Sequence, residues 1–508
     1  MRTKYSFYNL LGAIIGQFLG IVAQFASRRI FIICLNQTYL GVSGLFSNIL
    51  SVLSLMELGA GVAMTYSLYK PIAENQRELI KSLMRFYHKI YVMIGVAILI
   101  VGFAITPIYP YFIAGQCNIP HLTIIYWIFV INTAVTYFFS YKRTLIICDQ
   151  RRYIYSLTHY GMYAVGSILQ IIALLLTKNY IIYLLCLTIS TLLENAIITG
   201  IANKKYPYLK DKNVEELPKD EIGMLKKNIG SMLMHKIGGM VVSSTDNIIV
   251  SAFVGLNVVG IYSNYLLITD ALSKVAIQFF QAITASIGNL LVEKDTAHIN
   301  KVFQRTFFIG SVIYGTCTVA MLCGFQSFID WYAGGNYLLE FSTVILICIS
   351  FYVTGIRKAV LTFRDASATY YYDRYKAIAE AVMNLVLSIA FVKYMGIDGV
   401  ILGTILSAVS ISLWIEPLVL YKHILKDRIS LYFINLFVYA GITLIIAVAS
   451  LEICRHIIFS NMLLQTMERI VFSILFYLLM YCTVFWRKEE MQYCRNLIIN
   501  KVIMRKHE

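Results

Sequence analysis

Fourteen apolar runs of membrane-spanning length constrain this chain more than any other feature. Each run has at least 20 residues, and a transmembrane helix needs about 20. Hydrocarbon offers the backbone no hydrogen-bond partners, so a lipid-exposed span of this kind must be helical. The sequence therefore predicts an all-α, polytopic membrane protein. The predicted spans are 8–35, 39–69, 88–111, 121–147, 153–176, 180–202, 228–254, 257–290, 304–329, 338–362, 375–395, 398–421, 430–451 and 467–486.

The basic residues are distributed as expected for such a protein. Only 14% of the 508 residues are charged, against about a quarter in soluble domains. If the spans alternate, the segments on one side, counted together with the span ends that adjoin them, hold 35 of the 43 Lys and Arg, the other side holds three, and five lie deeper in the spans. The basic segments are 1–7, 70–89, 141–152, 203–227, 291–305, 356–376, 421–428 and 487–508. This asymmetry predicts a membrane protein with both termini in the cytoplasm. It also explains the net charge of +16 by insertion and by contact with membrane lipids, so we expect no nucleic-acid binding.

The second half of the chain repeats the first at an offset of about 216 residues. The segment from Gly44 (GLFSNIL) matches that from Gly260 (GIYSNYL), and the pair Lys142-Arg143 matches Arg357-Lys358. Because six spans separate the matches, the repeats should share one orientation, related by an axis along the membrane normal. The predicted divisions are an N-terminal lobe at 1–205, a cytoplasmic linker at 206–227, a C-terminal lobe at 228–425, and two further spans with a basic tail at 426–508.

The first span carries polar residues that lipid does not tolerate well. At about 100° per residue, Gln17, Gln24 and Arg28 share one narrow face, and Arg29 lies about a third of a turn away. A cation at the bilayer centre costs about 3 kcal/mol on insertion scales, so it rarely faces lipid. We expect Arg28 to face a hydrated cavity. The alternative is that the arginines extend to the membrane interface.

Spans seven and eight add further charged groups. His235 and Asp246 lie on one polar stripe of span seven, and Asp270 and Lys274 are four residues apart in span eight. Intramembrane charges mark substrate or ion pathways, but they also pair with one another. Asp270 and Lys274 are therefore candidates for either a site or a structural ion pair. His235 is a candidate for proton transfer or for packing.

Two acidic residues complete the set. Glu57 lies in span two, and Glu416 in span twelve is followed by Pro417. A proline inside a span frees a carbonyl group and bends the helix, which suits a moving or ion-binding element. The simpler interpretation of Glu416 is a position near the inner membrane interface.

The sequence gives no indication of an enzyme. It contains no P-loop, HExxH or GxSxG motif. Its ten cysteines form no CxxC pair, which favours a packing role over a disulfide framework or a metal site. We predict no catalytic residue, no metal and no cofactor.

Several short segments resemble the polysaccharide-flippase branch of the multidrug/oligosaccharidyl-lipid/polysaccharide (MOP) exporter superfamily. The resemblance runs through the first twelve spans. The segments are Arg29-Ile-Phe, Tyr39-Leu-Gly-Val-Ser-Gly-Leu-Phe, Ser54-Leu-Met-Glu-Leu-Gly-Ala-Gly, Thr245-Asp-Asn-Ile-Ile-Val and Gly396-Ile-Asp-Gly-Val-Ile-Leu-Gly-Thr.

This resemblance implies two six-helix lobes around a central cavity. It also implies flipping of undecaprenyl-pyrophosphate-linked oligosaccharides for capsule, O-antigen or exopolysaccharide. Pyrophosphate needs fixed cations, and arginine suits phosphate best. The candidate substrate-binding residues are Arg28, Arg29, Lys274, Gln17, Gln24 and His235. Those for binding Na⁺ or H⁺, or for balancing charge, are Glu57, Asp246, Asp270 and Glu416.

Three alternatives stay open at this point. The first is a multidrug or cation antiporter of the same superfamily, which predicts an acidic cavity. The second is a flippase for lipid II, the precursor of peptidoglycan. The third is a membrane scaffold for a polysaccharide synthesis complex. Under the main hypothesis, a polysaccharide polymerase and glycosyltransferases are possible partners.

Overall fold

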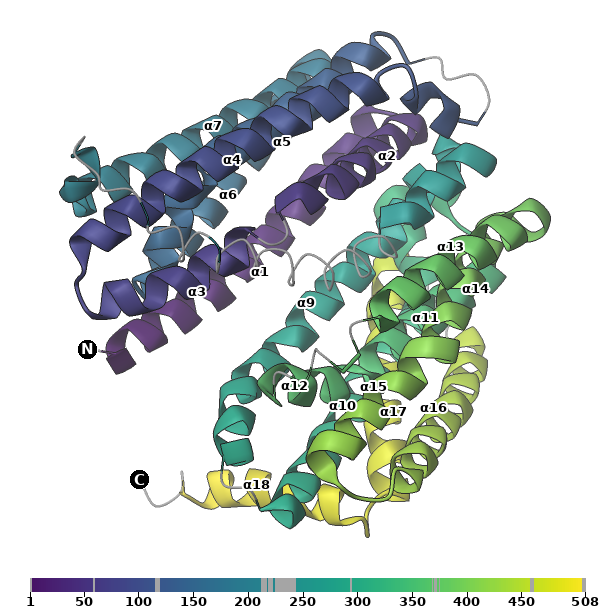
Figure 1. Ribbon diagram of the computed structural model, residues 1–508. Coiled ribbons are helices and arrows are strands. Elements are labelled where there is room, and N and C mark those ends of the chain that lie inside the picture. Colours follow the sequence, from purple (N-terminus) through teal and green to yellow (C-terminus); the bar gives the residue numbers. More distant parts are fainter. Residues whose placement is uncertain are drawn as a thin grey trace. The chain divides into compact units, whose positions relative to one another are not determined.

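The computed structural model describes residues 2–57, 60–114, 119–211, 217, 223, 244–292, 295–367, 369, 372–373, 375–456 and 461–504. Within these residues the chain is helical and contains no β-strand, which confirms the predicted all-α class. Figure 1 shows long helices joined by short connections. The helices form two compact units, Met1–Gly260 and Ile261–Glu508.

The helices of unit 1 follow the first six predicted spans closely. Two helices and a 3₁₀ turn replace the second span, and residues 244–253 form a further helix before α9. The elements are α1 (Arg2–Cys34), α2 (Gln37–Leu53), η1 (Ser54–Glu57), α3 (Ala60–Ala73), α4 (Arg77–Ile105), η2 (Tyr109–Phe112), α5 (Leu122–Cys148), α6 (Arg152–Thr177), α7 (Tyr180–Lys205) and η3 (Pro207–Lys210).

Unit 2 contains nearly all of the long helix α9 and the helices that follow it. One π-helical turn, at 408–412, interrupts the twelfth predicted span, and a second, at 421–425, begins at the last residue of that span. The elements are α9 (Leu256–Val292), α10 (Thr296–Ala333), η4 (Gly335–Tyr337), α11 (Phe341–Ile356), α12 (Lys358–Ser367), α13 (Lys376–Met395), α14 (Ile397–Ser407), η6 (Ala408–Ser412), α15 (Leu413–Leu420), η7 (Tyr421–Leu425), α16 (Ser430–His456), α17 (Met462–Val484) and α18 (Glu489–Met504).

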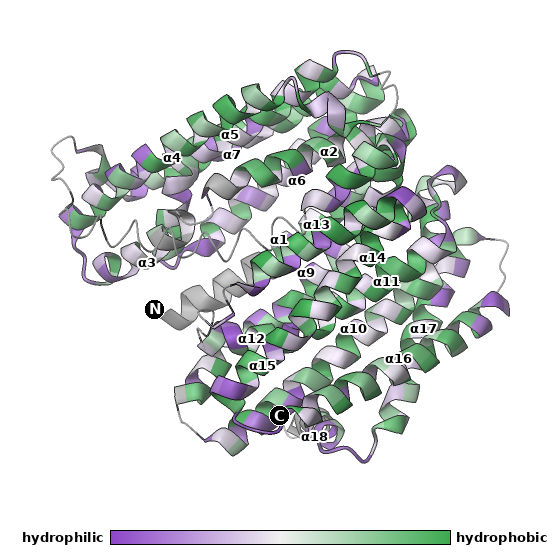
Figure 2. Cartoon of the chain, turned by 45° about the vertical axis from the view of Figure 1, so that its right-hand side comes forward, coloured by the Kyte–Doolittle hydropathy of each residue, from purple (hydrophilic) through white to green (hydrophobic). Residues whose placement is uncertain are grey.

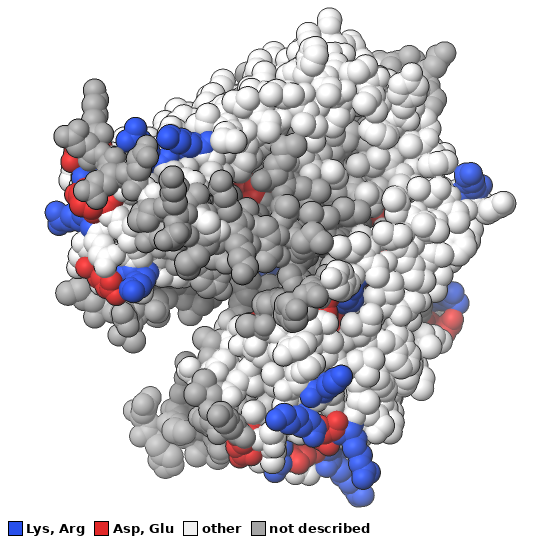
Figure 3. Space-filling model, viewed as in Figure 1, with Lys and Arg blue, Asp and Glu red and all other residues white. Residues whose placement is uncertain are grey.

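Twelve helices in the described part of the chain are long and apolar enough to cross a membrane. They correspond to twelve of the fourteen predicted spans. Of the other two, 39–69 is divided at η1, and 228–254 lies mostly outside the described residues. Figure 2 shows hydrophobic residues along the helices and hydrophilic residues concentrated near their ends. On the face seen in Figure 3, most charged side chains lie near helix ends.

The helix ends carry the capping residues that a sequence like this favours. The side chains of Asn36, Asn179, Asp295 and Asn461 accept hydrogen bonds from the first turns of α2, α7, α10 and α17. An N-cap of this kind stabilises a helix by about 1 kcal/mol. Lys178 adopts a left-handed conformation with φ of 50°, so α6 and α7 are joined by only two residues.

Glycines set the closest helix contacts of unit 1. A Cβ at Gly16 would lie 2.2 Å from the ring of Tyr160, so α1 packs directly on α6 there. The first turn of α9 approaches α2 even more closely. A Cβ at Gly41 would lie 1.9 Å from the carbonyl oxygen of Leu256, and a Cβ at Gly260 would lie 2.1 Å from that of Gln37.

An aromatic core joins the two extra C-terminal helices to α10. Tyr477 and Tyr481 of α17 are buried beside α10. The hydroxyl of Tyr481 is 2.7 Å from the Oγ of Ser311, and that of Tyr477 is 3.1 Å from the Oγ1 of Thr443. The predicted thirteenth and fourteenth spans, α16 and α17, are therefore part of the core of unit 2.

The last helix, α18, lies across the end of unit 2 rather than along its helices (Figure 1). The guanidinium of Arg305 lies 3.9 Å from the ring centre of Tyr493 in this helix. The ammonium of Lys488 donates hydrogen bonds to Asn435 and Tyr439 at 2.9 and 2.6 Å. Burial lowers the pKa of Lys488. These contacts hold the start of the basic tail against unit 2.

Candidate functional site in the two units

The polar stripe of α1 lies away from the exposed apolar face of that helix. Gln17, Gln24 and Arg28 are each half-buried. At about 100° per residue, the exposed apolar side chains lie on roughly the opposite side of α1. These side chains are Ile15, Phe18, Leu19, Val22 and Ile33.

Arg28 lies near three tyrosines of the neighbouring helices. Tyr163 belongs to α6, and Tyr180 and Tyr183 to α7, and the charge of Arg28 acts on all three hydroxyl groups. Arg29 is also half-buried, but the helical period turns it toward the exposed apolar side chains. The two arginines therefore occupy different environments within unit 1.

Glu57 lies at the break in the second predicted span. The helix stops at Leu53, η1 carries Glu57, and a new helix begins at Ala60. The hydroxyl of Tyr91 donates a 3.4 Å hydrogen bond to Glu57 Oε1, and Tyr137 lies in the same polar group. An interrupted helix at membrane depth is tolerated where protein or water satisfies its backbone.

An ionisable pair lies in unit 1, between α6 and α7. The Nδ1 of His159 is 2.9 Å from Glu194 Oε1, with the two side chains 38% and 16% exposed. The guanidinium of Arg143, on α5, lies 5.3 Å from the ring centre of Tyr155 and acts electrostatically on the same region as Glu194.

Unit 2 holds a more deeply buried cluster around Glu416. The Glu416 side chain is 1% exposed. It accepts two hydrogen bonds from Arg357, at 3.0 and 2.7 Å, and a short one from the ammonium of Lys376. Glu380 lies 3.4 Å from Arg357 and 3.5 Å from Lys376. Two cations and two carboxylates thus balance one another, so Glu416 has the geometry of a charge-balancing residue.

The internal repeat relates an ionisable pair in unit 1 to an ionisable pair in unit 2. His159 and Glu194 join the fifth and sixth predicted spans, and Lys376 and Glu416 join the eleventh and twelfth. Lys376 follows His159 by 217 positions, and Glu416 follows Glu194 by 222. The two spacings differ by five residues, which is between one and two helical turns. Each repeat therefore holds its last two helices together with an ionisable pair.

Asp270 and Lys274 are the residues for which the sequence left open either a site or a structural ion pair. Both are exposed on α9, and no salt bridge joins them among the described residues. Asp270 contributes instead to a cavity of about 180 Å³ between α9, α10, α11 and α12, which Lys358 also lines. Lys274 remains a candidate for binding an anion.

The remaining candidates are on span seven. Asp246 is half-buried in the helix formed by residues 244–253. His235 lies outside the described residues. The roles predicted for the α1 stripe, Lys274 and the four acidic residues remain predictions.

Sequence reasoning missed Arg357, Lys376 and Glu380, and also His159 with Glu194. Arg357 and Lys376 were assigned to a cytoplasmic segment, 356–376, because cations cluster there. In the structure α12 occupies half of that segment, and Arg357 and Lys376 point into the protein. A comparison of the two repeats at the fifth and eleventh spans could have found the pairs.

These observations define a class: a multi-pass α-helical membrane protein in which an ionisable pair joins two helices in each unit. No protein-family model matches the sequence, and no curated protein matches it. Solved structures do match. One is "Lipid II flippase MurJ, inward closed conformation", with a TM-score of 0.63, 15% identity, and coverage of 94% of this chain and 99% of that one.

Two MATE transporters have the same fold. A point mutant of the Vibrio cholerae MATE transporter VcmN matches with a TM-score of 0.55 and 12% identity over 84% of this chain and 98% of that one. An inward-facing MATE family transporter of the MOP superfamily matches with 0.56 and 14%, over 79% and 94%. At these identities the likeness establishes the fold, which this chain shares over nearly its whole length.

Proposed function

We propose that this protein is a flippase that moves undecaprenyl-pyrophosphate-linked oligosaccharides across the bacterial cytoplasmic membrane. The observation that carries the proposal is the position of Arg28. A guanidinium is held within an apolar span, on the same face as Gln17 and Gln24 and away from the exposed apolar side chains. Its neighbours include tyrosines, which are neutral donors and acceptors. Such a group suits a multiply charged pyrophosphate.

The proposed mechanism is alternating access. The two lobes rock so that a cavity opens first to the cytoplasm and then to the other side. Arg28 holds the pyrophosphate, with Arg29 and Lys274 contributing further positive charge, while the polyprenyl tail stays in lipid. Glu57, Asp246 and Asp270 bind a coupling Na⁺ or H⁺, or balance the cations when the site is empty. The buried cluster of Glu416 keeps unit 2 rigid as it moves.

The test is polymer export in cells. In a strain lacking the gene, we expect wild-type protein to restore surface polysaccharide and Arg28→Ala to restore none, at equal protein level in the membrane. Arg28→Lys keeps the charge but loses the planar fork, so we expect partial export. Lys178→Ala, at the α6–α7 turn, is the matched control. Normal polymer with Arg28→Ala would refute the proposal.

The alternative functions give different outcomes in the same strain. If the protein is a lipid II flippase, its depletion should cause loss of viability. The structural similarity to MurJ is compatible with this alternative. A multidrug antiporter predicts increased drug sensitivity with unchanged polymer. A scaffold predicts that charge-neutralised variants still support polymer synthesis.

A further inference from the structure

A cavity of about 470 Å³ opens at one end of unit 1, apart from the residues of the proposed transport site. It lies between α4, α5, the end of α7 and η3. Its charged and titratable lining consists of Lys81, Arg85, His88, Lys142 and Asp211. Three fixed cations therefore face one carboxylate. The volume is within the range of about 300–1,000 Å³ that small-molecule sites occupy.

Lys81 is a structural member of this group. Its side chain is 5% exposed, and its ammonium lies 2.7 Å from Glu78 and 3.0 Å from Asp211. Both carboxylates thus form salt bridges with Lys81. The salt bridge to Asp211 joins the end of η3 to α4. This arrangement fixes the wall of the cavity.

Lys142 is the cation best placed to bind an anion. It is half-buried, and its ammonium donates a 3.0 Å hydrogen bond to the amide oxygen of Asn203, a neutral group. No carboxylate lies within ion-pair distance of Lys142 among the described residues. Burying a cation without a countercharge is unfavourable, so an anion in the cavity would offset that cost. Arg85, exposed on the same wall, adds a second donor.

The position of the cavity indicates the source of the anion. Its lining comes from three segments that the charge distribution predicts to be cytoplasmic, 70–89, 141–152 and 203–227. The rest of the wall is apolar or aromatic and is formed by Met84, Tyr141 and Leu209. Basic pockets between transmembrane helices on the cytoplasmic side are suited to anionic lipid headgroups. We propose that this cavity binds the phosphate of an anionic membrane phospholipid.

The test measures lipid binding to the purified full-length protein. Phosphatidylglycerol is added to the protein in detergent, and the bound lipid is counted by native mass spectrometry. Phosphatidylcholine is the zwitterionic comparison. We expect Lys142→Gln and Arg85→Gln each to weaken phosphatidylglycerol binding about tenfold, the loss of one charge-assisted hydrogen bond. Arg85 is exposed, so Arg85→Gln should fold normally. This variant therefore tests the proposal even if Lys142→Gln fails to fold.

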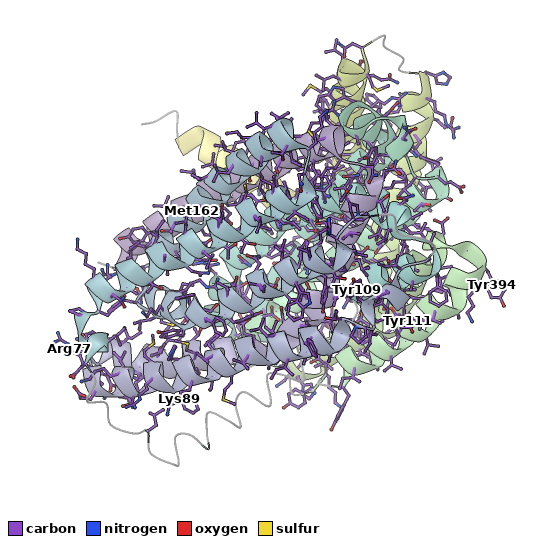
Figure 4. The ribbon with its side chains drawn as sticks, turned by 90° about the horizontal axis from the view of Figure 1, so that it is seen from above. Arg77, Lys89, Tyr109, Tyr111, Met162 and Tyr394 are labelled. Carbon is purple, nitrogen blue, oxygen red and sulfur yellow. The ribbon has the colours of Figure 1, made fainter. Side chains whose placement is uncertain are left out.

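Lys89→Gln is the matched control. Lys89 lies on α4 one turn from Arg85, does not line the cavity, and points away from the bundle in Figure 4. It should leave binding unchanged. Equal losses in all three variants, or equal binding of phosphatidylcholine, would overturn the proposal. Displacement of the lipid by millimolar inorganic phosphate would overturn the lipid assignment in favour of a soluble anion.

Discussion

At the scale of single residues, the structure separates charges that are paired inside the protein from charges that are exposed. Glu416 contacts Arg357 and Lys376 inside unit 2, so its charge is used within the protein. Lys274 and Asp270 lie four residues apart without a salt bridge. Burial and pairing therefore distinguish groups that the sequence alone presents as equivalent intramembrane charges.

Removing the charge of Glu416 should destabilise the protein. Glu416→Gln leaves two buried cations with Glu380 as their remaining acid. Breaking a buried ion pair from one side costs about 3–5 kcal/mol. We expect a clearly lowered melting temperature in detergent. Glu452→Gln, which breaks the exposed pair with Arg455, should change it little. Equal shifts in both variants would contradict the assignment.

At the scale of elements, glycines of α10 allow α17 to pack closely on it. A Cβ at Gly315 would lie 1.9 Å from the hydroxyl of Tyr477. We expect Gly315→Ala to cost about 1–3 kcal/mol through overpacking, measured by thermal unfolding. Tyr477→Phe removes the nearest atom, so the same substitution should cost less in that background. Gly441→Ala, with open space around it, is the control, and equal costs in both backgrounds would refute this contact.

A cross-link should test whether α2 and α9 separate during transport. The Oγ1 of Thr38 lies 2.7 Å from the Oδ1 of Asn257, where the backbones meet at Gly41 and Gly260. Cysteines at positions 38 and 257 should form a disulfide on oxidation, because the helices are close enough. Alternating access predicts that oxidation stops transport and that a reductant restores it. Full transport by the cross-linked protein would exclude movement at this contact.

The elements also show what the sequence can predict. Hydropathy located twelve helices that the structure describes, because spans must be long and apolar. It could not locate the break at η1, since residues 54–61 are apolar apart from Ser54 and Glu57, and the hydrogen bond from Tyr91 to Glu57 joins residues 34 positions apart. The buried role of Arg357 was missed for a similar reason: pairing depends on tertiary structure.

At the scale of the whole molecule, the repeat is the feature that the sequence and the structure share. The matched glycines lie on α2 and α9, and each repeat carries an ionisable pair on its last two helices. The predicted lobe boundaries at 205 and 228 remain predictions, as do the predicted orientation and the cavity between lobes. They follow from loop charge and from resemblance, which no described contact tests.

The central claim is that the protein moves a pyrophosphate-linked oligosaccharide across a bilayer. The most direct measurement uses purified protein in vesicles that contain an undecaprenyl-pyrophosphate oligosaccharide, with a membrane-impermeant glycosidase outside. Without protein, about half of the sugar, the outer half, should be cleaved, because large polar headgroups cross bilayers very slowly. Wild-type protein should make all of it accessible and Arg28→Ala should not. Cleavage that stays at half with wild-type protein, whatever ion gradient is applied, would contradict the account.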